Sequence, residues 1–257
     1  MSRITLDVAA TVATLTVDAP AGGFDRPLVE ALTATAAELT ARHPELRAVV
    51  VTTAGPDFGS GWSAGALAEA AALPSLSGVL APLGAGFAAI ADVPQPTVAT
   101  IRGVAHSAGL ELALACDMRV AAAGATFAMP ETARGLVPRG GGTQRLPRIV
   151  GRAQALRLLL TGECIDAAEA LRIGLVSAVV PDGEEVAAAT AIARTIASRG
   201  PLATRFVKEA ITRGIELPLE EALRLELELT VLLQTTADRA EGVAAFVEGR
   251  EPGFVGR

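Results

Sequence analysis

Short apolar runs typical of strands alternate with segments of helical periodicity along the first half of the chain. LRAVVVTT (46–53) and PTVATI (96–101) are compact runs of strand type, and a loop rich in Gly and Pro follows the first. Between 28 and 43, after the start signals Asp25 and Pro27, apolar residues recur at helical spacing, and Ala-rich helical stretches separate the two runs. Strands that alternate with helices in this way predict an α/β fold.

The flanking segments extend this pattern. ITLDVAATVATLTVD (4–18) alternates apolar and polar residues around a small-residue turn and predicts a hairpin of two strands. GLELALACD (109–117) predicts a buried helix, and MRVAAAGATFAMP (118–130) predicts a strand, a turn and a second short strand. From about residue 142 the pattern is mainly helical, with one short strand candidate at 175–180.

The last helices carry apolar positions that have little chain left to pack against. Such faces either complete an interface between subunits or fold back onto the chain's own core, and the pattern leaves both open. The positions are Ala222, Leu225, Leu229 and Leu232, followed by Val243, Ala244 and Phe246.

Charge and composition exclude several classes of protein. A formal net charge of -6 argues against a nucleic-acid partner, because affinity for a phosphate backbone comes from dense Lys and Arg contacts. Cys116 and Cys164 are too few for a disulfide framework, and no secretory pattern opens the sequence, so we expect a cytoplasmic protein. The apolar stretch 79–91 is too short to cross a bilayer, and 97–128 is interrupted by charges, so no membrane span is expected.

Two matches or near-matches to the serine-hydrolase motif G-x-S-x-G occur, GWSAG (61–65) and AHSAG (105–109). The first is separated from the preceding strand by a loop, whereas AHSAG follows the strand candidate 96–101 and opens a helix. A serine nucleophile also needs a histidine base, and His43 and His106 are the two histidines of the sequence. No histidine follows Ser107, so a serine esterase is kept only as an alternative from another enzyme class.

Other motifs for cofactors are weak. GAGFAA (84–89) imitates a dinucleotide fingerprint but follows no convincing strand, and PRGGGTQ (138–144) lacks the Lys-Ser or Lys-Thr of a phosphate loop. Both predict only packing or turn glycines. No His and Cys cluster has zinc spacing, so no metal is expected.

Two glutamates stand out as candidates for acid and base chemistry. Glu111 lies in the apolar helix 109–117, where a carboxylate is costly unless it is paired or used. Glu131 follows Pro130 at the start of an expected short helix, a place where a glutamate often only complements the helix dipole.

Four segments together resemble the enoyl-CoA hydratase/isomerase, or crotonase, superfamily. The resemblance covers most of the chain, and GGTQRLPR followed by TGECIDAAEALRIGLVSAVV is specific in order and spacing. The segments are AVVVTTAGPDFGSGWS (48–63), the long stretch 96–151, ALRLLLTGECIDAAEALRIGLVSAVVP (155–181) and EGVAAFVEGREPGF (241–254).

The resemblance implies a fold, an assembly and a substrate. The family fold is a crotonase-like spiral of β-β-α turns with a C-terminal helical region that forms trimers, commonly paired into hexamers. We therefore expect a core with the acyl-CoA site over 1–195 and a helical oligomerisation region over 196–257. The implied substrate is an acyl-CoA thioester, with coenzyme A as part of the substrate and no separate cofactor.

The resemblance also implies roles for individual residues. In such members the thioester oxygen lies between two backbone N–H groups, which match Trp62 and Ala108, and Gly61 and Gly109 beside them let the backbone approach the substrate. Glu111 and Glu131 match the two glutamates of true hydratases, one of which handles the attacking water while the other gives a proton to the α-carbon. Which glutamate takes which role stays open.

One departure from the family concerns specificity. Arg139 stands where the family often has glycine, near the attacking water, so it either reads an acidic group on the acyl chain or points outward. The leading expectation is an enoyl-CoA hydratase. An enoyl-CoA isomerase that uses one glutamate and a catalytically inactive scaffold member are the alternatives within this fold.

Overall fold

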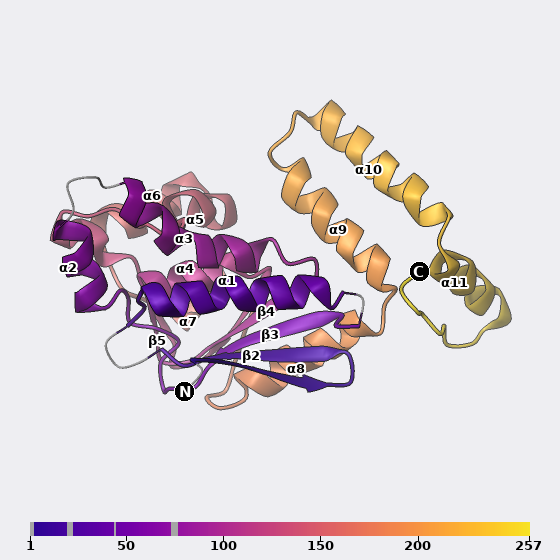
Figure 1. Cartoon of the computed structure of the whole chain (residues 1–257), viewed down its shortest axis with the longest axis horizontal. Helices are drawn as coiled ribbons and strands as arrows, with labels where there is room; N and C mark the ends of the chain where they lie inside the picture. Colours follow the sequence, from indigo (N-terminus) through magenta and orange to yellow (C-terminus); the bar gives the residue numbers. More distant parts are fainter. Residues whose placement is uncertain (1–2, 20–22, 44, 73–76) are drawn as a thin grey trace.

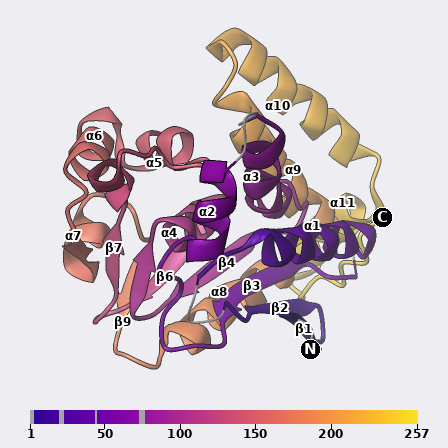
Figure 2. The same cartoon turned by 60° about the vertical axis from the view of Figure 1, so that its left-hand side comes forward.

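The computed structural model describes residues 3–19, 23–43, 45–72 and 77–257. Within these ranges a six-stranded sheet has the order β1-β2-β3-β4-β6-β9 (Figures 1 and 2). β1 and β2 pair antiparallel, and each later pair of neighbours is parallel. The strands are β1 (Ile4–Ala9), β2 (Val12–Val17), β3 (Ala48–Thr53), β4 (Thr97–Ile101), β6 (Met118–Ala122) and β9 (Ala178–Val180).

Helices cover both faces of this sheet, as Figure 1 shows. On one face α1 (Arg26–Ala41) packs against α3 (Ser77–Ala91), and on the other α8 (Glu185–Ala197) packs against β3, β4 and β6. α1 begins where the sequence predicts, because the Asp25 carboxylate accepts a hydrogen bond from Leu28 N at 3.0 Å and caps the helix.

The burial of both faces of β3 explains why its sequence is a compact apolar run. Successive side chains of a strand point to opposite faces. Val50 packs with Ala189 of α8, whereas Val49 and Val51 belong to the main core on the α1 side. Both faces are therefore dry, as is typical of a parallel sheet covered by helices.

A second, three-stranded sheet has the order β5-β7-β8. The sequence predicts β7 (Thr126–Ala128), but it does not predict β5 (Val104–His106) or β8 (Ile165–Asp166). Strands of three and two residues are too short to show a period. β5 leads into α4 (Ala108–Ala115), which confirms the buried helix predicted at 109–117.

The remaining predictions for the core are confirmed in outline. The hairpin at 4–18 forms β1 and β2, and the strand candidate at 175–180 contains β9. In the described ranges no helix has the length and apolar character that crossing a membrane requires. The shorter helices are α2 (Ala64–Ala72), the 3-10 helix η1 (Pro130–Arg134), α5 (Gly142–Val150), α6 (Arg152–Thr161) and α7 (Ala167–Arg172).

Three C-terminal helices extend away from the sheet (Figures 1 and 2). They are α9 (Pro201–Gly214), α10 (Leu219–Gln234) and α11 (Ala237–Glu248), and α10 packs against α9. The boundary predicted after residue 195 falls in the last turn of α8. Many apolar side chains of the three helices are exposed, including Val207, Ile211, Leu219, Leu223, Leu227, Val231, Phe246 and Val247.

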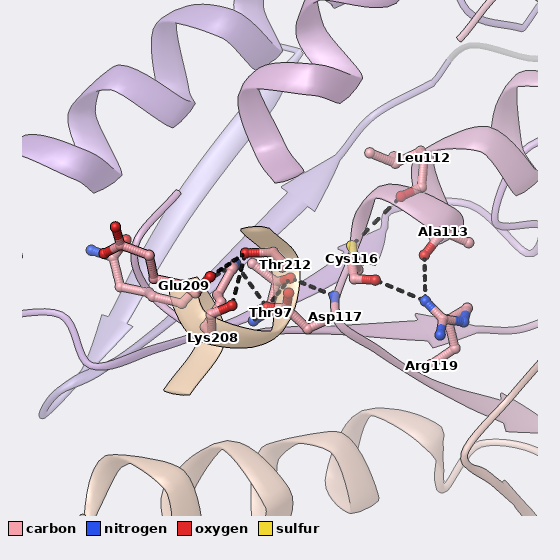
Figure 3. A network of polar contacts seen from close by, with 10 residues as sticks. Thr97, Leu112, Ala113, Cys116, Asp117, Arg119, Lys208, Glu209 and Thr212 are labelled. Atoms are coloured by element: carbon pink, nitrogen blue, oxygen red, sulfur yellow. Dashed lines mark hydrogen bonds and ion pairs between the residues drawn. The ribbon is translucent and has the colours of Figure 1, made fainter. Parts of the chain in front are cut away.

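A partly buried ion pair connects α9 to the segment between α4 and β6 (Figure 3). Lys208 Nζ lies 2.8 Å from Asp117 Oδ2 and donates a hydrogen bond to Gln95 O at 3.1 Å. The Asp117 carboxylate also accepts hydrogen bonds from the backbone N and the hydroxyl of Thr97, at 2.7 and 3.0 Å. Only 10% of the Lys208 side chain is exposed, so removing Asp117 would leave the ammonium group largely buried and without its ion-pair partner.

Candidate active site

The loop that contains Gly59 and Gly61 packs closely against the start of α4. His106 N donates a hydrogen bond to Gly59 O at 2.8 Å, and a Cβ on Gly109 would lie 2.3 Å from the same oxygen. Gly61 adopts a φ of +128°, and a Cβ there would meet the Cβ of Ser107 at 3.2 Å. Gly109 is therefore required by close approach, and Gly61 by its backbone conformation.

Two backbone N–H groups at this contact have no acceptor in the described ranges. Trp62 lies between Gly61, whose O accepts from Phe24 N at 2.8 Å, and Ser63, whose N donates to Phe24 O at 2.8 Å. Because alternate residues of an extended segment pair with one neighbour, the Trp62 N–H is not used by Phe24. Ala108 is the first residue of α4, where an N–H has no intrahelical acceptor.

Ser107 makes the sharp turn that presents Ala108. Its φ of 51° and ψ of -121° are unusual for a residue with a side chain. Hydrogen bonds on both sides hold it there, from Ser107 N to Ala128 O at 2.9 Å and from Glu111 N to Ser107 O at 2.9 Å. The backbone of this turn is thus fixed from β7 and from α4 itself.

This turn resembles a nucleophile elbow, but neither serine has a histidine base. His106 Nε2 contacts Thr126 Oγ1 at 3.3 Å and Cys164 Sγ at 3.5 Å. His43 lies beside Arg205, and the Ser63 hydroxyl accepts from Ala66 N at 3.1 Å. The geometry gives the esterase alternative no support.

Glu111 is fully buried in α4 and is held by one carboxylate oxygen. Its Oε1 accepts hydrogen bonds from Gly140 N at 2.6 Å and Gly142 N at 3.0 Å, whereas its buried Oε2 has no hydrogen-bond partner. Burial raises the pKa of Glu111 to about 7, the two N–H groups oppose this shift, and the charge of Glu131 adds to it. The side chain can therefore exchange a proton near neutral pH.

The glycines that hold Glu111 come from PRGGGTQ, which the sequence alone indicated only as packing or turn glycines. That interpretation was incomplete, because two of the three glycines supply N–H donors to a carboxylate. Arg145 supports this loop by donating from Nη1 to Gly140 O at 2.7 Å, and its charge lowers the pKa of Glu111. A single unexplained glutamate in an apolar helix is the signal that could have prompted a search for such donors.

Glu131 is the second residue of η1 and lines a small cavity. It is 4% exposed, and neither of its carboxylate oxygens has a hydrogen-bond partner. Trp62, Ser107 and Arg139 line the same cavity. The structure thus brings together Glu131, Arg139 and the residues beside the two unused N–H groups. Glu111 does not appear among the described lining residues, but its pKa responds to the charge of Glu131.

The buried carboxylate of Glu111 predicts a pH-dependent stability difference from Glu111→Gln. Because the pKa of Glu111 rises from 4.5 to about 7 on folding, the folded chain holds the proton more tightly than the unfolded chain does. The parent chain therefore loses stability as the pH rises between these two pKa values. A shift of this size corresponds to about 3 kcal/mol. Denaturant unfolding should show Glu111→Gln gaining stability relative to the parent chain between pH 5 and 8. The exposed Glu184→Gln is the control, and a pH-independent difference for Glu111→Gln would contradict the prediction.

Comparison with known proteins places this site in a family. The sequence model of the enoyl-CoA hydratase/isomerase family matches residues 7–257. A probable enoyl-CoA hydratase, echA8 of Mycobacterium bovis, is 40% identical over 214 residues, which are 83% of this chain and 82% of that protein. A crotonyl-CoA hydratase of Syntrophomonas wolfei is 41% identical over 171 residues, 66% of each chain.

Solved structures agree with the sequence comparison. The crystal structure of an enoyl-CoA hydratase from Bacillus anthracis superposes with a TM-score of 0.92 at 34% identity, over 99% of this chain and 100% of that one. The chain belongs to the enoyl-CoA hydratase/isomerase family, and its α/β architecture with C-terminal helices is the crotonase fold. The described residues contain no cluster of His, Cys, Asp and Glu that could hold a metal ion.

Proposed function

We propose that this chain is an enoyl-CoA hydratase, a carbon-oxygen lyase that adds water across the 2,3 double bond of a 2-enoyl-CoA thioester. One observation carries the proposal. Glu111 and Glu131 are both buried, and Glu111 Oε2 and both oxygens of Glu131 have no hydrogen-bond partner. Buried carboxylate oxygens are costly to leave unpaired, so their presence is explained by a substrate and a water that complete them.

The unused N–H groups of Trp62 and Ala108 would bind the thioester oxygen. When water attacks the β-carbon, the electron pair of the double bond moves toward this oxygen and forms an enolate. Fixed donors aimed at the developing charge lower the barrier, and each is worth roughly 2.7–4 kcal/mol. Gly61 and Gly109 serve this step by allowing the two backbones to approach each other.

The two glutamates would move the protons. One carboxylate accepts a proton from water as the oxygen bonds to the β-carbon, and the other, protonated, gives its proton to the α-carbon of the enolate. The charge of Glu131 raises the pKa of Glu111, so the protonation of Glu111 depends on this neighbour. The net reaction adds H and OH to the double bond and changes no redox state, so coenzyme A enters only as part of the substrate.

The test is direct. Purified protein is mixed with short, long, branched and cyclic 2-enoyl-CoA thioesters, and loss of the absorbance of the conjugated thioester is recorded. Turnover of at least one member is expected. Retained binding of acyl-CoA without turnover on any of them would favour the scaffold alternative, and a shifted double bond without hydration would favour an isomerase.

We also propose that the C-terminal helices form the contact between subunits of a homotrimer, alone or paired into a hexamer. The support is the row of exposed apolar side chains on α10, Leu223, Leu227 and Val231, which is unusually apolar for a surface facing water. Light scattering after size exclusion should give a trimer or hexamer. Leu227→Asp is expected to shift it toward monomer, while Val8→Asp on β1, also at an exposed position, leaves it unchanged. A parent chain that is already monomeric would refute this assembly.

A further inference from the structure

Arg139 has a guanidinium nitrogen that nothing in the described chain satisfies. Its Nη1 is buried and makes no hydrogen bond. A buried N–H donor of a charged group is costly to leave without an acceptor, and the cost exceeds that of a neutral donor. An oxygen acceptor for this nitrogen would therefore have to come from outside the described residues.

The described cavity that Arg139 lines, with Glu131 and Trp62, offers such an acceptor a place beside the arginine. Arg134 lines this cavity too, so its charged lining residues are two arginines and one glutamate. The excess of positive charge favours an anionic group in this space. Glu131 does not supply the acceptor, because both of its oxygens are without a hydrogen-bond partner.

The placement of the cavity says which part of a substrate would bring that anion. Trp62 and Ser107 line it, and both border the N–H groups proposed to hold the thioester oxygen. The apolar side chains of Leu67, Leu136 and Val137 also line it. Because the cavity borders these N–H groups, an anion bound in it would lie close to the thioester carbonyl. The anion then belongs to the acyl group and not to coenzyme A.

We propose that Arg139 is a specificity-determining residue that binds a carboxylate at the far end of a short acyl chain, so that the preferred substrate is a dicarboxylic enoyl-CoA. Arginine suits this task because its planar fork of N–H donors matches the two oxygens of a carboxylate. The inference rests on the proposed function for the chemistry, but the binding preference does not depend on turnover.

Binding of two unreactive ligands tests the proposal. Glutaryl-CoA and pentanoyl-CoA have the same number of acyl carbons and differ in a terminal carboxylate against a methyl group. By isothermal titration the parent chain should bind glutaryl-CoA more tightly. Arg139→Met should lose at least tenfold in affinity for glutaryl-CoA and less than twofold for pentanoyl-CoA. Arg152→Met, at an exposed arginine on α6, is the control and should change neither.

The outcomes separate this inference from the proposed hydratase activity. No preference for glutaryl-CoA in the parent chain, or an equal loss for both ligands in Arg139→Met, would overturn the inference even if enoyl thioesters are hydrated. The expected loss confined to glutaryl-CoA would support it even if neither glutaconyl-CoA nor 2-pentenoyl-CoA is hydrated, and then the proposed reaction alone would fail.

Discussion

Glu111→Gln and Glu131→Gln should each lower kcat for hydration by about 10²- to 10⁴-fold, the range expected when a positioned proton-transfer group is lost. In Glu111→Gln the new amide oxygen can still accept the hydrogen bonds of Gly140 N and Gly142 N, so the fold around it should persist. What the variant loses is the ability to accept or give a proton at the position of Oε2. The measurement is the rate of loss of thioester conjugation at saturating substrate.

The pattern across the two variants distinguishes the alternatives. Glu184→Gln removes an exposed carboxylate on a loop and should leave kcat unchanged. If only one of the two buried glutamates is needed, an isomerase-like mechanism replaces the hydratase. Full activity in both variants would remove the carboxylate pair from the mechanism altogether.

Gly109→Ala should lower kcat nearly as much as the glutamate substitutions do, although it changes no functional group. The added Cβ would lie 2.3 Å from Gly59 O and 2.7 Å from Gly59 C, so the loop carrying Trp62 must move away from α4. Loss of one oxyanion donor costs roughly 10²- to 10³-fold in kcat. Forcing extra volume into a packed contact costs roughly 1–3 kcal/mol of stability.

A second glycine provides the matched control. Gly65→Ala in α2 places its Cβ 3.8 Å from Ser63 Oγ, which is ordinary contact, and alanine is the better helix former. Kinetics and denaturant unfolding of both variants should show an unchanged or slightly stabilised Gly65→Ala. If Gly109→Ala keeps the parent kcat, the N–H groups of Trp62 and Ala108 do not need the close approach described above.

Local patterns predicted the large elements because each is set by residues close together in sequence. The six residues of β3 are all buried, so the run reads as a strand in any context, and Asp25 marks the start of α1 by itself. The surroundings of Glu111 could not be predicted in this way. Its donors lie 29 and 31 residues further along the chain, and nothing in GLELALACD indicates them.

Local patterns singled out Glu111 and Glu131, and the resemblance to a family added the N–H groups of Trp62 and Ala108 and the side chain of Arg139. A family pattern nevertheless identifies positions in the sequence, and it does not show which polar atoms at those positions form hydrogen bonds. That Arg139 has a buried nitrogen without a partner follows only from packing. The same holds for the unpartnered oxygens of Glu131, which sequence alone cannot tell from an ordinary carboxylate at a helix start.

The ion pair between Lys208 and Asp117 has a practical consequence. Lys208 is the only lysine of the chain, and its amine is occupied by Asp117 and by the carbonyl of Gln95. A reagent that acylates side-chain amines therefore has one target, and the ion pair with Asp117 should slow its reaction while α9 stays packed against the sheet. The rate of acylation at Lys208, read by mass spectrometry, therefore reports how firmly this ion pair is held, without introducing a label.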